Sequence, residues 1–216
     1  MVIGENQGGT YCMHSRHAIF GVPGFKIRMP VKPLAVKAWF EVYPGLMNVC
    51  VAAEELFSEA VEEYGIDGTA LRMSTNYGWS PGVRFNLVVN HFVFRGLTNR
   101  PLTVYGDGSN WRPFIHVRDA ARAYAQAALE PESWPQQVYN VGSNDANYRI
   151  AEIAEIVREE LDRELDVTYL EDEHPGPSYH VNFDRLAETG FDPEWTLRDG
   201  IQDIATELQQ TTHTNT

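Results

Sequence analysis

The chain has 216 residues with 30 acidic and 17 basic side chains and a formal net charge of −13, which argues against nucleic acid or an anionic membrane as a partner because both require a basic face. Its 43% of hydrophobic residues can form one substantial core or two small ones. No apolar run approaches the ~20 residues that cross a bilayer, and the first residues lack a secretory pattern, so we expect a cytoplasmic protein.

The charge is unevenly distributed along the chain. Residues 1–50 carry a net charge of +3 and contain all three lysines, both cysteines and four of the five methionines. Residues 51–216 carry a net charge of −16, and every basic residue among them is arginine. This lysine-free, carboxylate-rich part has the composition of an acidic, salt-adapted proteome. The cysteines, Cys12 and Cys50, lack the spacing of a zinc site, and no metal is predicted.

Helices and strands are predicted only from Val51 onward. Residues 1–50 show short apolar patches separated by Gly and Pro, and no element is assigned there. From Val51 to Tyr64 apolar residues recur at helical spacing, and Gly65 ends this helix. The later pattern predicts a strand at 68–73, a loop at 74–84, a helix at 85–97, strands at 102–105 and 113–117, a helix at 117–129, a strand at 137–141, a helix at 150–165, a strand at 166–170, and helices at 183–189 and 197–208. Helices alternating with short strands predict an α/β fold.

Five motifs follow one another in this region. They are Ala-Ala-Glu-Glu-Leu-Phe at 52–57, Ala-Leu-Arg-Met-Ser-Thr-Asn-Tyr-Gly at 70–78, Leu-Thr-Val-Tyr-Gly-Asp-Gly-Ser at 102–109, Arg-Pro-Phe-Ile-His-Val-Arg-Asp at 112–119 and Val-Tyr-Asn-Val-Gly-Ser at 138–143. Together they resemble the C-terminal part of the extended short-chain dehydrogenase/reductase superfamily, the NAD-dependent epimerases and dehydratases of nucleotide sugars.

The resemblance implies the C-terminal portion of a Rossmann-type parallel sheet and a small α+β domain that binds the nucleotide sugar, with the cofactor half incomplete. The small domain is expected to comprise residues 85–109 and 167–207. The expected layout is an atypical leader at 1–50, an epimerase/dehydratase-like region at 51–208 and a flexible tail at 209–216. The resemblance also implies NAD or NADP as cofactor, a nucleotide-sugar ligand, and either a homodimer or a complementing subunit.

Arg112 is the main candidate for ligand binding. The resemblance places it on the sugar-nucleotide diphosphate, and a guanidinium fork matches phosphate oxygens and stays charged at any working pH. The alternative is an ion pair with a nearby carboxylate, Asp107 or Asp119.

Two further positions are implied to contact cofactor or substrate. Ser74 and Thr75 end the strand at 70–73, where α/β folds place binding groups, although Thr75 alternatively starts the loop through a local turn. Asn86 and Leu87 open a helix whose free N–H groups suit phosphates, although Asn86 alternatively acts as an ordinary N-cap.

The strand at 102–105 is similar to the one that lines the nucleobase in relatives. That makes Val104 and Tyr105 substrate-binding candidates, with a core position as the alternative for Tyr105. His116 is interpreted as a structural histidine between two apolar strand residues. Asp119 is expected to start or cap the following helix.

Three departures from the family pattern concern the chemistry. The expected Tyr-x-x-x-Lys pair, in which tyrosine is the acid/base and lysine lowers its pKa, falls on Leu46 and Cys50, so no catalytic residue is assigned. No glycine-rich dinucleotide loop follows a strand. His174 stands where relatives have a second diphosphate-binding arginine, and either His174 or His180 is counted as a partial substitute.

The sequence therefore predicts an epimerase/dehydratase-like protein that binds or acts on a nucleotide-diphosphate sugar in polysaccharide synthesis, truncated and catalytically impaired. A non-catalytic binding module and a non-functional remnant of an interrupted gene are the alternatives. The break in composition coincides with the edge of the resemblance, which suggests that residues 1–50 are not native to the fold.

Overall fold

The computed structural model describes residues 2–6, 9–14, 17–22, 25–30, 46–65, 68–171 and 178–214. The chain divides into two compact units, Met1–Ile66 and Asp67–Thr216.

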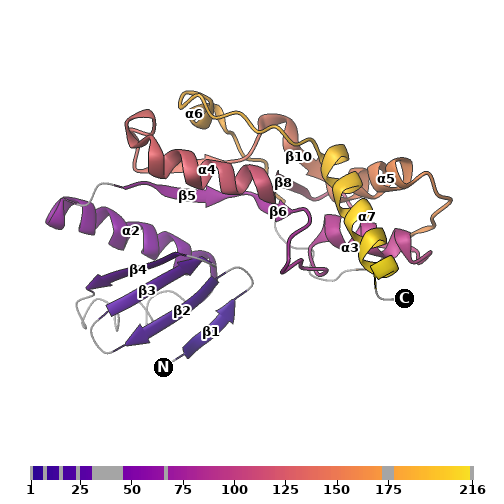
Figure 1. Cartoon of the computed structure of the whole chain (residues 1–216), viewed down its shortest axis with the longest axis horizontal. Coiled ribbons are helices and arrows are strands. Elements are labelled where there is room, and N and C mark those ends of the chain that lie inside the picture. The colour runs from indigo at the N-terminus through magenta and orange to yellow at the C-terminus, as the bar shows by residue number, and fades with distance from the viewer. Residues whose placement is uncertain are drawn as a thin grey trace. The chain divides into compact units, whose positions relative to one another are not determined.

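The first unit contains a meander of four antiparallel strands and one helix (Figure 1). The strands are β1 (Val2–Asn6), β2 (Gly9–His14), β3 (His17–Val22) and β4 (Phe25–Pro30). The sequence assigned no element here, because Gly and Pro interrupt the strand alternation. Helix α2 (Leu46–Tyr64) begins five residues before the predicted start at Val51. Pro44 and Gly45 are the nearest helix breakers, and none lies between Gly45 and Val51.

The second unit has an α/β architecture with three small sheets. Parallel pairing joins β5 (Ala70–Met73) to β9 (Val138–Val141), β6 (Thr75–Tyr77) to β8 (Trp111–His116), and β7 (Leu102–Tyr105) to β11 (Val167–Leu170). Strand β10 (Asn147–Arg149) pairs antiparallel with the other edge of β8. The helices are α3 (Val88–Leu97), α4 (Val117–Leu129), α5 (Ile150–Leu161), α6 (Asp184–Ala187) and α7 (Leu197–Thr214), with short 3-10 turns at Pro131–Ser133 and Asn144–Ala146. The parallel pairs confirm the predicted α/β class.

Two hydrophobic cores hold this unit together. The helical core lies where α3, α5 and α7 pack side by side against β7, and its fully buried members include Val93, Val104, Ile153 and Ile201. The sheet core lies around β9, α4 and α6, with Tyr139, Ala123 and Leu186 buried. Helix α5 contributes to the helical core, although the two segments predicted for a small domain, 85–109 and 167–207, leave out residues 150–161.

Several predicted boundaries were wrong for identifiable reasons. Helix α3 begins at Val88 rather than residue 85, because Leu87 has extended backbone angles. Helix α5 ends at Leu161 because Asp162 adopts the left-handed conformation, with φ of 47°. The loop predicted at 74–84 contains β6, and α7 continues to Thr214 through most of the predicted flexible tail.

Candidate functional site

The start of β8 gathers residues from three distant parts of the chain. Strand β10 lies on one edge, with Arg149 opposite Trp111 and Tyr148 opposite Arg112. On the other edge lies the segment Ser178–His180, called here the edge segment. The Trp111 amide donates to Ser178 Oγ over 3.0 Å, and the Tyr179 amide donates to the Trp111 carbonyl over 3.2 Å.

The guanidinium of Arg112 is held by neutral groups. Its Nη1 donates to the Trp111 carbonyl over 2.8 Å, and its Cζ lies 4.9 Å from the centroid of the Tyr179 ring. Among the residues that the structure describes, no carboxylate pairs with Arg112. Neither predicted alternative partner does, because Asp107 accepts from Ser109 and Asp119 accepts from Arg122. The charge of Arg112 is therefore not neutralised by an acidic side chain of the described part.

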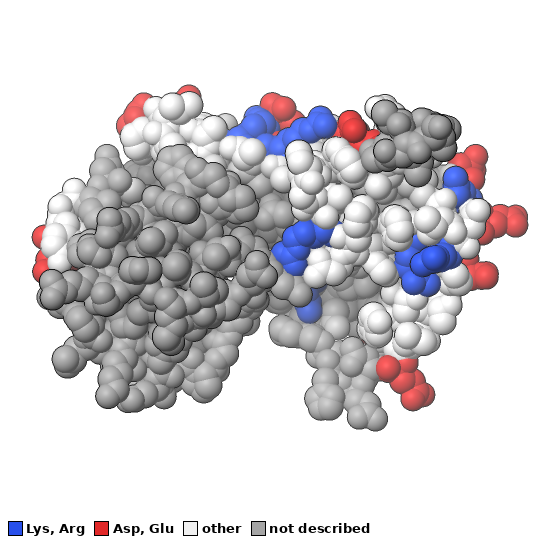
Figure 2. Space-filling view, turned by 60° about the horizontal axis from the view of Figure 1, so that its bottom comes forward, with Lys and Arg blue, Asp and Glu red and all other residues white. Residues whose placement is uncertain are grey.

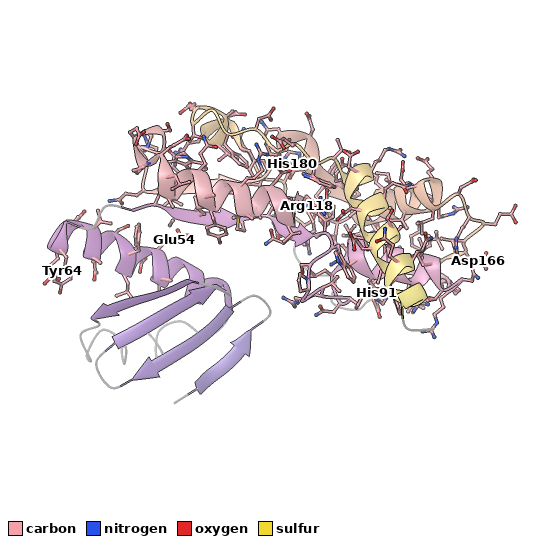
Figure 3. All side chains as sticks on the ribbon, viewed as in Figure 1. Glu54, Tyr64, His91, Arg118, Asp166 and His180 are labelled. Atoms are coloured by element: carbon pink, nitrogen blue, oxygen red, sulfur yellow. The ribbon has the colours of Figure 1, made fainter. Side chains whose placement is uncertain are left out.

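A second basic group, Arg149, lies near the same strand end. Its Cζ is 4.9 Å from the centroid of the Trp111 ring, and the ring of His180 is 5.6 Å from that of Trp111. Figure 3 labels His180 on the stretch that leads to α6. On the face shown in Figure 2, basic side chains lie among uncharged ones, while most acidic side chains lie toward the outline. The sequence did not single out Trp111, Arg149 or Tyr179. Only the folding of the chain brings Tyr179 to Arg112 and Arg149 to Trp111.

Ser74 takes a structural position. The Ser74 side chain is buried, and its hydroxyl donates to the Val141 carbonyl over 2.8 Å, which ties the end of β5 to β9. A Cβ on Gly142 would lie 2.4 Å from the Ser74 Oγ, so no space remains between them. Thr75 is half-buried at the start of β6, opposite Phe114. The predicted cofactor contact at Ser74 does not fit this arrangement, because the hydroxyl is already used inside the fold.

Asn86 is exposed and Leu87, not Asn86, is the N-cap residue of α3. The capping role proposed as the alternative for Asn86 is therefore wrong. The polar residue that organises this loop is the buried Asn90. Its Oδ1 accepts from the Gly78 amide and its Nδ2 donates to the Arg84 carbonyl, each over 3.1 Å. An asparagine inside the apolar run of α3 was the sequence signal that could have found it.

The two candidates on β7, Val104 and Tyr105, point to opposite faces of the strand, because successive side chains of a strand alternate. Val104 is fully buried in the helical core, so its side chain is not available to a ligand, contrary to the prediction. Tyr105 is 64% exposed at the end of the strand, opposite Leu170, so the core alternative for Tyr105 is wrong. Leu46 and Cys50 lie in the first turns of α2, and His174 lies outside the described residues.

His116 is fully buried, as the structural interpretation expects, and it caps α4. Its Nδ1 accepts from the Arg118 amide over 3.4 Å, which places the ring proton on Nε2, 3.7 Å from the carboxylate of Asp203. The imidazole stacks on Trp195 with the ring centroids 4.2 Å apart. Asp119, expected to start or cap this helix, lies in its first turn, and its carboxylate accepts from the amides of Glu194 and Trp195.

This burial predicts a pH dependence of stability. Burial lowers the pKa of His116 below its ordinary value near 6.5, although the nearby carboxylates, Asp203 first, oppose the effect. When the pKa of a histidine is lower in the folded than in the unfolded protein, the free energy of unfolding is unaffected above the pKa of the unfolded state. It decreases as the pH falls below that value, about 6.5, because the unfolded state then binds more protons. We expect the urea midpoint to be lower at pH 5.5 than at pH 7.5, and we expect this difference to be smaller in His116→Gln. His180→Gln, which alters an exposed histidine, should keep the wild-type pH profile, and an unchanged profile in His116→Gln would contradict the assignment.

Among residues 52–65, 68–171 and 178–210, no three His, Cys, Asp or Glu side chains come together as metal ligands would. No helix in the described part of the chain has the length and apolar character needed to span a membrane.

Known proteins with similar sequences or folds were compared with this chain. Residues 51–142 match the NAD dependent epimerase/dehydratase family. A putative UDP-glucose 4-epimerase of Methanocaldococcus jannaschii is 27% identical over 70% of this chain and 48% of its own length. UDP-glucuronic acid decarboxylase 2 of Arabidopsis thaliana is 23% identical over 96% of this chain, an extent that includes most of residues 1–50, and over 46% of its own length.

Among solved structures, dTDP-glucose 4,6-dehydratase from Bacillus anthracis in complex with NAD superposes with a TM-score of 0.65 and 22% identity. The superposition covers 79% of this chain and 54% of that protein. The likeness confirms the Rossmann-type fold of the matched part. The chain spans about half the length of the curated relatives that it matches.

Proposed function

Because residues 51–142 match the NAD dependent epimerase/dehydratase family, we propose that this chain binds a nucleotide-diphosphate sugar and that Arg112 contacts the diphosphate. The observation that carries the proposal is the state of the Arg112 guanidinium. It is held by the Trp111 carbonyl and the Tyr179 ring, and no described carboxylate neutralises it. A charged, planar group in that state suits a phosphate pair, because its remaining N–H donors fit phosphate oxygens bidentately.

Other residues supply the surroundings of this contact. We propose that Tyr105 lies against the nucleobase, because it is exposed at the end of β7. Asn86 and the backbone of Leu87 precede the first turn of α3, where free N–H groups favour a phosphate. Thr75 completes the set at the start of β6.

We further propose that the chain is catalytically impaired and acts as a substrate-binding protein in cytoplasmic polysaccharide synthesis. The positions expected for the acid/base tyrosine and its lysine carry Leu46, which has no titratable proton, and Cys50, which lacks the positive charge by which lysine lowers the tyrosine pKa. NAD(P) supplies the hydride-transfer chemistry in such enzymes. The Ser74 hydroxyl does not fit a contact with this cofactor, because it already donates to the Val141 carbonyl. We also propose that the chain pairs with a second copy of itself or with a complementing subunit.

Isothermal titration with UDP-, GDP- and dTDP-sugars tests the binding. We expect saturable binding of at least one of them, and a loss of about 10- to 100-fold in affinity in Arg112→Ala, because a charge-assisted hydrogen bond contributes about 1.5–3 kcal/mol. Arg100→Ala removes an exposed guanidinium elsewhere and should bind like the wild type. Absence of binding to every nucleotide sugar would contradict the proposal.

The catalytic activity of the chain and the origin of residues 1–50 are tested in separate experiments. Incubation with NAD or NADP and the bound nucleotide sugar should give no product, and measurable turnover would contradict the impaired state. Reading the DNA upstream of the codon for Val51 in all frames tests whether residues 1–50 replace a lost segment. A glycine-rich loop and a Tyr-x-x-x-Lys pair in another frame would support that origin.

A further inference from the structure

The edge segment is fixed to the main chain of a single residue. Both backbone groups of Trp111 bond to it, the amide to Ser178 Oγ and the carbonyl to the Tyr179 amide. On its other edge the same strand pairs with β10. Ser178–His180 is therefore held against the start of β8 by one side-chain and one backbone hydrogen bond.

The sheet alternation divides the side chains here between two faces. Trp111 lies on one face with its cross-strand neighbour Arg149, whose guanidinium lies over the indole, and His180 meets the same indole at 5.6 Å. Arg112 lies on the opposite face with its own cross-strand neighbour, Tyr148. The aromatic and cationic contacts on the Trp111 face therefore hold the edge segment from the side away from Arg112.

On the Arg112 face the edge segment presents Tyr179. Its ring centroid is 4.9 Å from the Arg112 Cζ, and its side chain is 44% exposed. An aromatic face attracts a guanidinium through its quadrupole but carries no net charge. The Tyr179 ring therefore fixes the direction of the Arg112 side chain without neutralising its charge. A carboxylate in the same place would compete with an anionic ligand.

We propose that Tyr179 is a positioning residue that orients Arg112 toward the diphosphate of the nucleotide sugar. This inference rests on the proposed function and adds to it the group that preorganises the arginine. An arginine held in its binding direction before the ligand arrives loses less conformational entropy on binding. Tyr179 acts through Arg112, so its effect must disappear when Arg112 is removed.

The test measures the affinity of the full chain for the tightest-binding nucleotide sugar of a UDP-, GDP- and dTDP-sugar set. We expect Tyr179→Ala to weaken binding about 3- to 20-fold, because an exposed to partly desolvated cation–π contact is of that size. Tyr179→Phe keeps the ring and should stay within about twofold of the wild type. Tyr124→Ala, which removes a 40% exposed tyrosine on α4, should not change the affinity.

A double-mutant cycle separates positioning from other roles. In the Arg112→Ala background, Tyr179→Ala should cause no further loss. An equal loss in both backgrounds, or no loss in the single variant while Arg112→Ala weakens binding, would overturn the positioning role and leave the proposed function intact. Full-strength binding by Arg112→Ala, or no binding by the wild type, would overturn both. Urea midpoints of each variant verify that the folded protein is being titrated.

Discussion

Replacing Asp119 with alanine is expected to destabilise the protein by about 3–5 kcal/mol, because it removes a fully buried carboxylate from a network of charged and backbone partners. This carboxylate accepts from Arg122 Nη1 at 2.7 Å, from the Glu194 amide at 3.1 Å and from the Trp195 amide at 2.9 Å. Alanine leaves the two amides without this acceptor, while Arg122 keeps the Asp192 carbonyl and the Glu194 carboxylate. Urea unfolding followed by circular dichroism measures the loss as a lower midpoint at constant slope.

Two further variants sharpen this measurement. Asp119→Asn keeps one acceptor oxygen but loses the charge, so it should retain part of the stability lost in alanine. Asp166→Ala, labelled in Figure 3, removes an exposed carboxylate and should change stability by less than about 0.5 kcal/mol. A loss below about 1 kcal/mol in Asp119→Ala would show that the 194–195 segment is held by other contacts.

Gly78→Ala is expected to destabilise the protein by about 3 kcal/mol or more, because two independent costs add. The backbone φ at this position is +119°, which side-chain-bearing residues rarely adopt. A Cβ there would lie 2.4 Å from Nε2 of His116. That imidazole cannot move aside easily, because it is fully buried and stacked on Trp195. Thermal or urea unfolding measures the loss.

Gly106→Ala is the matched control for this prediction. Gly106 also has a positive φ, +68°, but nothing lies within 4 Å of a Cβ at that position. It should therefore carry only the cost of left-handed backbone, about 1–2 kcal/mol. Equal losses in the two variants would indicate that the contact with His116 relaxes without cost.

The strength of the local pattern decided which elements the sequence could predict. Strand β7 at Leu102–Tyr105 and helix α4 at Val117–Leu129 were predicted with the observed bounds, because their apolar periodicity is clear and because Gly106 follows the strand and Pro131 follows the helix. Strands β6 and β10 have three residues each, too few for an alternation to be recognised. Their existence depends on β8, which pairs with both.

The candidate site was predictable only where one residue type carries the chemistry. Arg112 could be singled out because a guanidinium within a family motif suits phosphate. Its holder, Tyr179, is 67 positions along the chain and belongs to no motif, so its role emerges only from the strand edge that both share. Val104 was misjudged because its inward direction depends on the core that α3, α5 and α7 form over the strand.

The bonds of Asp119 have a consequence for the dynamics of the second unit. Asp119 lies on α4, which contributes to the sheet core, while the amides that it binds immediately precede α7, which contributes to the helical core. His116 adds a second link, because it caps α4 and stacks on Trp195. Protected amides of Val141 in one core and Ile201 in the other should therefore exchange with deuterium in a single opening event of common free energy. The two cores are expected to behave as one foldon.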